Sequence, residues 1–288
     1  MAILCVLLVV IWSTGFIVGK LIVGLMDPNI FLSIRFFFAG LLFLAFAYWQ
    51  GRAFPKWADI PKHMLAGVLM NSVYLGLSYL AISKGLPAGV MALIGALQPV
   101  LVAILAWSLV KEKTSLMGLL GMLIGISGLI LVISPALHFE LGELGINPVT
   151  LVLACVAILA LSFGVTYQKM SIASADLISA MAIQNLAAWL VSMSFVWFLG
   201  ERQFEVQLAT FLLIIWGVVV LSGAGLFLMV WLVRRVTASK VSVLLLLAPP
   251  LAAIESYFIF NETLTSLQIA GFGVTIFGVY ISQVKGKA

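Results

Sequence analysis

The sequence predicts an all-α integral membrane protein whose ten transmembrane helices form two inverted five-helix repeats. The first observation is composition: 64% of the residues are hydrophobic and 9% are charged, whereas soluble domains are about half apolar and about a quarter charged. The second is a series of apolar runs of about 20 residues, the length that crosses about 30 Å of hydrocarbon. The third is a match of the chain to itself half a length apart.

The apolar runs are continuous and lack the alternation of membrane strands, so helices are predicted over a barrel. The first run follows no basic residue and precedes no small-residue cleavage site, which predicts a retained helix over a signal peptide. The expected spans lie near 2–24, 30–49, 63–82, 88–110, 114–133, 149–168, 178–199, 208–231, 241–260 and 265–284.

The self-match joins the segment Ala96–Val132 to the segment Leu246–Ser282. It places Pro99 on Pro249 in the middle of a span, and it also aligns two glutamates at span ends and several glycines. Five spans per half is an odd number, so the second half must enter the membrane from the opposite side. The predicted repeats are 1–135 and 149–288, joined by a loop at 136–148.

Basic residues predict the orientation of the chain. If the N-terminus is cytoplasmic, 11 of the 15 Lys and Arg residues lie in cytoplasmic segments, and only Lys84 and Arg202 lie in external loops. Both termini are therefore expected in the cytoplasm. The expected location of the chain is the plasma membrane, the inner membrane of a bacterium. Loops that face anionic lipid explain the net charge of +5 without nucleic acid.

Several of these features together resemble a known family. Trp12 and Ser13 early in span 1, Arg35 in span 2 and the two Pro-x12-Glu segments resemble the EamA-type transporters of the drug/metabolite transporter superfamily. The resemblance covers essentially the whole chain and implies a central cavity between the halves, with spans 5 and 10 at the periphery. It implies a small-molecule substrate and the lipid bilayer as partners.

The resemblance implies a secondary active or facilitative transporter that exports small metabolites or amino acids by alternating access. An inverted repeat supports this mechanism because it offers two conformations of similar energy, one open to each side. Two alternatives remain open. A nucleotide-sugar-like exchanger would need more exposed basic residues in the cavity than this chain offers, and a non-transporting membrane sensor or assembly partner would show no flux.

A stripe of polar residues predicts a water-filled cavity. Asn71, Tyr74 and Ser78 recur at helical spacing on one face of span 3, with Tyr79 beside them. Hydrogen bonding between helices is the alternative explanation. The predicted cavity residues are Trp12, Ser13, Asn71, Tyr74, Ser78, Tyr79, Gln98 and Ser162.

Mid-span prolines predict hinges. A proline removes one helical hydrogen bond and frees a carbonyl near the middle of the membrane. This applies to Pro99 in span 4 and to Pro249 and Pro250 in span 9. Their symmetric repetition favours a hinge or the wall of a binding site, and a kink that serves only helix packing is the alternative.

Three ionisable residues lie within spans at a similar depth, about 6 to 8 Å below the outer surface. They are Lys20, Arg35 and Glu255. Because an unpaired charge in hydrocarbon costs about 2 to 3 kcal/mol or more, we expect Glu255 to form a gating ion pair with Lys20 or Arg35. Snorkelling to the headgroups and direct handling of substrate or protons are the alternatives.

The two repeated glutamates, Glu112 and Glu262, are expected to cap the helix that follows each of them. The glycines of spans 5 and 10 predict close helix packing, within the chain or in a homodimer.

Enzymatic function is not expected. The two histidines, His63 and His138, lie at ends of spans on opposite sides, and Cys5 and Cys155 also lie near opposite faces. These positions predict no metal site and no catalytic Ser-His arrangement. No Walker-type loop occurs in the sequence, so neither ATP nor another cofactor is expected.

Overall fold

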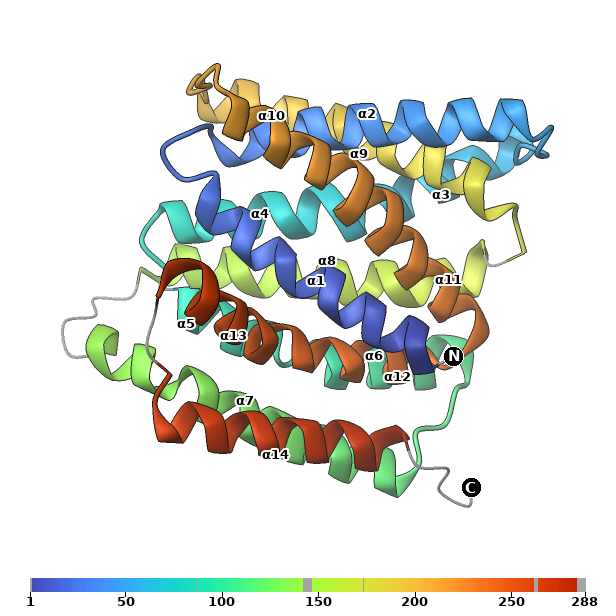
Figure 1. Ribbon diagram of the computed structural model, residues 1–288. Coiled ribbons are helices and arrows are strands. Elements are labelled where there is room, and N and C mark those ends of the chain that lie inside the picture. Colours follow the sequence, from blue (N-terminus) through green and yellow to red (C-terminus); the bar gives the residue numbers. More distant parts are fainter. Residues whose placement is uncertain (1, 87, 142–146, 173, 262–263, 284–288) are drawn as a thin grey trace.

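The protein is a bundle of helices that run roughly along one common direction (Figure 1). The computed structural model describes residues 2–86, 88–141, 147–172, 174–261 and 264–283. Eight helical stretches in this part of the chain have the length and apolarity needed to cross a bilayer. The expected span at 88–110 is interrupted, with Gln98–Val110 as a shorter apolar helix, and the ten-span arrangement stays a prediction.

The α-helices follow one another with short connections. They are α1 (Ala2–Leu21), α2 (Pro28–Trp49), α3 (Ile60–Gly67), α4 (Tyr74–Ser83), α5 (Ala88–Gly95), α6 (Gln98–Leu105), α7 (Leu116–Leu141), α8 (Pro148–Ser171), α9 (Leu177–Leu199), α10 (Leu208–Ile215), α11 (Phe227–Arg235), α12 (Ala238–Leu244), α13 (Ala248–Phe260) and α14 (Ser266–Gln283). The predicted loop 136–148 is shorter than expected because α7 continues to Leu141; residues 142–146 and Glu262 lie outside the described residues.

Short 3₁₀ and π-helical segments precede or interrupt several of these helices. Two are 3₁₀ turns, η1 (Trp57–Asp59) and η5 (Leu245–Leu247), and three are π-helical, η2 (Val68–Val73), η3 (Ala106–Val110) and η4 (Trp216–Leu226). Isolated π-helical turns within α-helices occur frequently at functional sites. Here η2 connects α3 to α4, and η4 connects α10 to α11.

Local sequence explains where the long helices begin and end. The side chain of Asp176 accepts hydrogen bonds from the backbone N–H groups of Ile178 and Ser179, so it caps α9. Gly200 ends the same helix in the left-handed conformation that glycine adopts without strain. Pro148 begins α8, where its missing N–H costs no hydrogen bond.

Backbone irregularities recur at the spacing of the sequence repeat. Leu97 (φ −76°, ψ −14°) and Leu247 (φ −78°, ψ −15°) precede α6 and α13 with nearly the same angles. Lys111 (φ 61°) and Asn261 (φ 54°) both adopt the left-handed conformation. In both pairs the second residue follows the first by 150 positions, so the two halves depart from regular helix at equivalent places.

The prolines of spans 4 and 9 lie in the first turns of helices, and their role as hinges stays a prediction. Pro99 lies in the first turn of α6, and the first turn of α13 likewise contains proline, at Pro249 and Pro250. A proline in the first turn costs no helical hydrogen bond, because the N–H it lacks would have no helical partner. Each proline therefore starts a new helix after a tight turn and does not kink a continuous one.

Helices α7 and α14 pack side by side along one edge of the bundle (Figure 1). A Cβ atom at Gly128 would lie 2.4 Å from the backbone N of Thr275, and one at Gly278 would lie 2.3 Å from the backbone N of Gly125. Only glycine permits this approach. These glycines are therefore used for packing within the chain, and the homodimer stays a prediction.

Candidate functional site

A cavity of about 780 Å³ lies between the helices. Its lining comes from both halves of the sequence, from α1, α2, η2 and α4 to α7 in the first and from α8, η4, α12, η5 and α13 in the second. Helix α1 begins and α14 ends at one end of the bundle, the termini end, and the connection from α1 to α2 lies at the other, the far end (Figure 1). The exposed residues Gly24, Ser83 and Gln203 line the cavity at the far end.

Three residues that line this cavity carry buried polar atoms without protein partners. Asn71 in η2, Gln98 in α6 and Ser242 in α12 all line it. Among the described residues, Oδ1 of Asn71, Nε2 of Gln98 and Oγ of Ser242 are buried with no hydrogen-bond partner. A buried polar group without a partner costs about 1 to 3 kcal/mol. Water or a bound solute that reaches these atoms would satisfy this mixed set of donors and acceptors.

Six of the eight predicted cavity residues line this cavity, namely Trp12, Asn71, Tyr74, Ser78, Tyr79 and Gln98. The hydroxyl of Ser78 is already used, since it donates to the carbonyl of Tyr74. Ser13 and Ser162 are fully buried and lie outside the lining. Ser162 donates to the carbonyl of Ile158 within its own helix, so the structure does not bring it to the cavity.

Each of the three ionisable residues of the predicted ion pair contacts a group outside that set, and a pair between Glu255 and Lys20 stays a prediction. Glu255 accepts a 2.6 Å hydrogen bond from the hydroxyl of Ser13, which joins α13 to α1. Arg35 donates from Nε to Oγ of Ser222 at 2.7 Å, which joins α2 to η4. Within the described part of the chain, no ion pair links Glu255 to Arg35. Lys20 lies over the ring of Phe260, with 4.1 Å from Nζ to the ring centroid.

A cluster of charged and backbone groups joins both halves at the termini end. We call it the Glu112–Lys169 cluster, and it comprises Glu112, Lys169, Val236 and Ala238. Glu112 forms an ion pair with Lys169 and accepts a 3.2 Å hydrogen bond from the backbone N–H of Ala238. Lys169 also donates to the carbonyl of Val236 at 2.5 Å.

This cluster corrects the expectation for Glu112. Its carboxylate lies at the first residue of α12, near a helix N-terminus that favours negative charge. It therefore contacts a helix of the other half, not α7, which follows it in the chain. No signal in the sequence indicates the contact between Lys169 and Glu112.

The connections at the far end are also bonded to one another. Asp27 accepts hydrogen bonds from the backbone N–H groups of Arg202 and Gln203, both at 2.8 Å, and an isolated antiparallel bridge pairs Met26 with Phe204. Asp27 and Gln203 line the cavity as well. This contact between the halves thus forms part of the rim and leaves the cavity open beside it.

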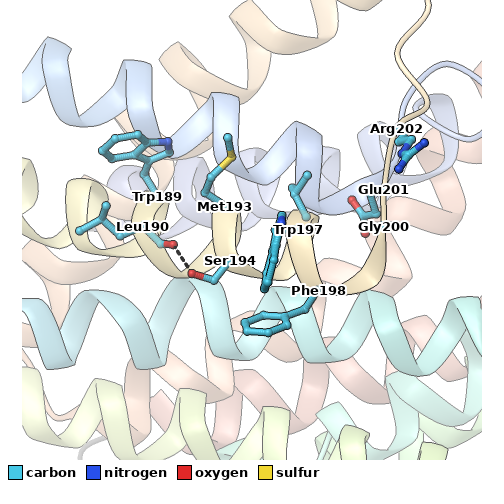
Figure 2. Close-up of a pocket in the computed structure, with 10 residues that line it drawn as sticks. Trp189, Leu190, Met193, Ser194, Trp197, Phe198, Gly200, Glu201 and Arg202 are labelled. Carbon is cyan, nitrogen blue, oxygen red and sulfur yellow. Dashed lines mark hydrogen bonds between the residues drawn. The ribbon is translucent and has the colours of Figure 1, made fainter.

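A second hollow of about 730 Å³ lies along the exposed face of α9 (Figure 2). Aromatic and apolar side chains dominate it, and Trp197 and Phe198 are 77% and 74% exposed. The hydroxyl of Ser194, which lines this hollow, already donates to the carbonyl of Leu190, as Figure 2 shows. This hollow offers a surface suited to lipid tails, and the polar cavity between the halves is the candidate site.

Comparison with known proteins identifies related chains. The sequence model of the EamA-like transporter family matches residues 1–134 and 149–283. The uncharacterized inner membrane transporter YedA of Escherichia coli is 26% identical over 95% of this chain and 87% of its own length. A probable amino-acid metabolite efflux pump of Salmonella typhimurium is 24% identical over 97% of this chain and 93% of its own.

The fold also matches a solved crystal structure. The TM-score is 0.82 at 16% sequence identity, and the match covers 98% of this chain and 96% of the other. The eight apolar helical stretches, together with the family match and the relative named as an inner membrane transporter, place the chain among integral membrane proteins.

Proposed function

Because the chain belongs to the EamA-like transporter family, we propose that this transporter exports small metabolites by alternating access, with amino-acid metabolites as the first candidates. The efflux pump of Salmonella typhimurium supports this substrate class, and the inner membrane transporter of Escherichia coli supports a bacterial inner membrane location. The main observation in favour is a cavity lined by both halves that contains unpartnered polar atoms.

The proposed arrangement has ten spans in two inverted repeats, 1–135 and 149–288, with residues 136–148 between them. Paired backbone irregularities, at Leu97 and Leu247 and at Lys111 and Asn261, support the repeat. The start of α1 and the end of α14 at one end of the bundle support termini on the same side (Figure 1). The connections between helices on that side carry an excess of basic residues, which supports a cytoplasmic location for it.

In this orientation the structure corresponds to an outward-open state. The cavity reaches exposed residues at the far end, while the Glu112–Lys169 cluster joins the halves at the termini end. An inward-open state follows when the two halves exchange conformations, so that contacts at the termini end break and the far end closes.

The cavity chemistry suits a solute with both polar and apolar parts. Trp12 and Tyr74 offer aromatic faces to an apolar portion. Asn71, Gln98 and Ser242 offer both donors and acceptors to a polar portion. The volume falls in the range of small-molecule sites, roughly 300 to 1,000 Å³.

Flux measurements in proteoliposomes test this function. Liposomes with the purified full chain are loaded with radiolabelled amino acids and related metabolites, and efflux is compared with protein-free liposomes. We expect solute-dependent efflux that Asn71→Leu reduces at least tenfold, because the cavity loses a polar group worth about 1.4 kcal/mol or more. The matched control is Ser194→Ala on the outer face of α9, which should transport normally. Efflux no faster than in protein-free liposomes for every solute would refute the proposal.

A further inference from the structure

Arg35 is a buried cation whose charge is only partly satisfied by the protein. Its residue exposure is 7%, and it lines the cavity from α2. One of its nitrogens, Nε, donates to Ser222. No ion pair or hydrogen bond joins its two terminal nitrogens to any residue in the described ranges. A guanidinium held in this way is expensive at membrane depth unless an anion accompanies it.

Within the described part of the chain, the acidic residues near the cavity do not supply that anion. Asp27 is the acidic residue in the lining, and its Oδ2 already accepts two backbone hydrogen bonds at the rim. Glu255 lies outside the lining, and its Oε1 accepts from Ser13. The electrostatic character of the cavity therefore favours a solute with a negative group.

The bond to Ser222 also orients the guanidinium. Arg35 comes from the first half and Ser222 from the π-helical η4 of the second half. A planar guanidinium fixed at Nε presents its remaining donors as a rigid fork, which matches the two oxygens of a carboxylate. Tyr79 lines the same cavity, and its hydroxyl lies beside α1, where a Cβ at Gly19 would be 3.4 Å from it.

We propose that Arg35, held by Ser222, binds the carboxylate of the transported solute and thereby selects for carboxylate-bearing small molecules. This assignment rests on the proposed function and adds the residue that determines specificity. The uncharged polar atoms of Asn71, Gln98 and Ser242 then remain for the other polar group of the solute.

Direct binding to the purified full chain tests the assignment without flux. The probes are L-leucine and L-phenylalanine, each paired with its amide, and inorganic phosphate as a non-carboxylate anion. Binding is measured by the shift in Tm and by protection of a cysteine introduced at Ser242 from a maleimide, in a variant without Cys5 and Cys155. We expect at least one amino acid to bind and its amide to bind roughly 10- to 100-fold more weakly, the range for a lost hydrogen bond to a charged group.

Substitutions of Arg35 test whether this residue causes the preference for the acid over its amide. Arg35→Gln should remove the preference for the acid over the amide, and Arg35→Lys should retain part of it because the charge remains without the fork. If Arg35→Gln does not fold, the comparison of acid and amide on the unmodified Arg35 still decides the question.

Three outcomes overturn the assignment: an amide that binds as tightly as its acid, phosphate that protects as well as the amino acids, or no binding by either amino acid. Each of these leaves the transport function standing if flux of other solutes is observed. Absence of flux combined with a carboxylate preference would instead refute transport and retain the binding site.

Discussion

Loss of the Glu112–Lys169 ion pair should open the cavity toward the termini end. The substitution is Lys169→Met, which keeps an apolar side chain of similar length but removes the ion pair with Glu112 and the bond to the carbonyl of Val236. Glu112 then keeps only its bond to the start of α12. The ion pair between Glu112 of the first half and α8 of the second half is lost.

The size of the effect follows from burial. The side chains of Lys169 and Glu112 are 19% and 14% exposed. The energy lost with this pair should therefore lie between that of an exposed pair, about 0.2 to 1 kcal/mol, and the cost of truncating a fully buried pair, about 2 to 5 kcal/mol. A loss of about 2 kcal/mol changes a conformational ratio by about 30-fold. The population that is open at the termini end should rise by that factor.

Cysteine accessibility measures this population. Ser242 is 1% exposed, lines the cavity and lies in α12, one turn after Ala238. In a variant without Cys5 and Cys155, a cysteine at Ser242 is labelled with a membrane-impermeant maleimide applied from the side of the termini end. Lys169→Met should raise the labelling rate about 30-fold.

The control breaks another ion pair at the same end. Lys62→Met removes a pair with Asp59 whose side chains are 48% and 41% exposed, and it should leave the rate unchanged. If Lys169→Met labels no faster than Lys62→Met, the cluster does not hold the termini end closed and the reasoning fails.

Two further predictions concern helix packing and topology. Gly128→Val should lower Tm in detergent, because its Cβ would overlap the backbone N of Thr275. The control Gly273→Ala should leave Tm unchanged, because no atom lies within 4 Å of its Cβ. Equal Tm values for the two variants would contradict the close α7–α14 contact. A cysteine at the exposed Ser83 should be labelled from outside intact cells and one at the exposed Lys56 only from the cytoplasm, and the reverse pattern would invert the proposed orientation.

The sequence predicts the helical segments well because the bilayer demands continuous apolar runs. The expected span at 30–49 is α2, Pro28–Trp49, and the expected span at 178–199 is α9, Leu177–Leu199. Helical spacing alone also selected the polar stripe from Asn71 to Tyr79, which lines the cavity. In each case the prediction depends on periodicity or length within one segment.

Contacts between segments could not be predicted in the same way. Depth in the membrane suggested that Glu255 would pair with Lys20 or Arg35, but depth does not fix the direction in which a helix presents a side chain. Glu255 bonds to Ser13, and Arg35 bonds to Ser222 in a π-helical segment. The wider turn of η4 could not be read from its apolar, glycine-containing sequence, Trp216–Leu226.

The paired irregularities suggest which segments change during the proposed cycle. If transport exchanges the conformations of the two halves, positions that already have the same backbone angles in both halves need not change. Leu97 and Leu247 have nearly equal angles, and Lys111 and Asn261 are both left-handed, so the turns next to the prolines should act as fixed corners. The halves differ where η4 extends over 11 residues and its counterpart η2 over 6. Because η2 contains Asn71 and η4 contains Ser222, the partner of Arg35, a change of helical geometry in these two segments would move both polar groups of the cavity as access changes sides.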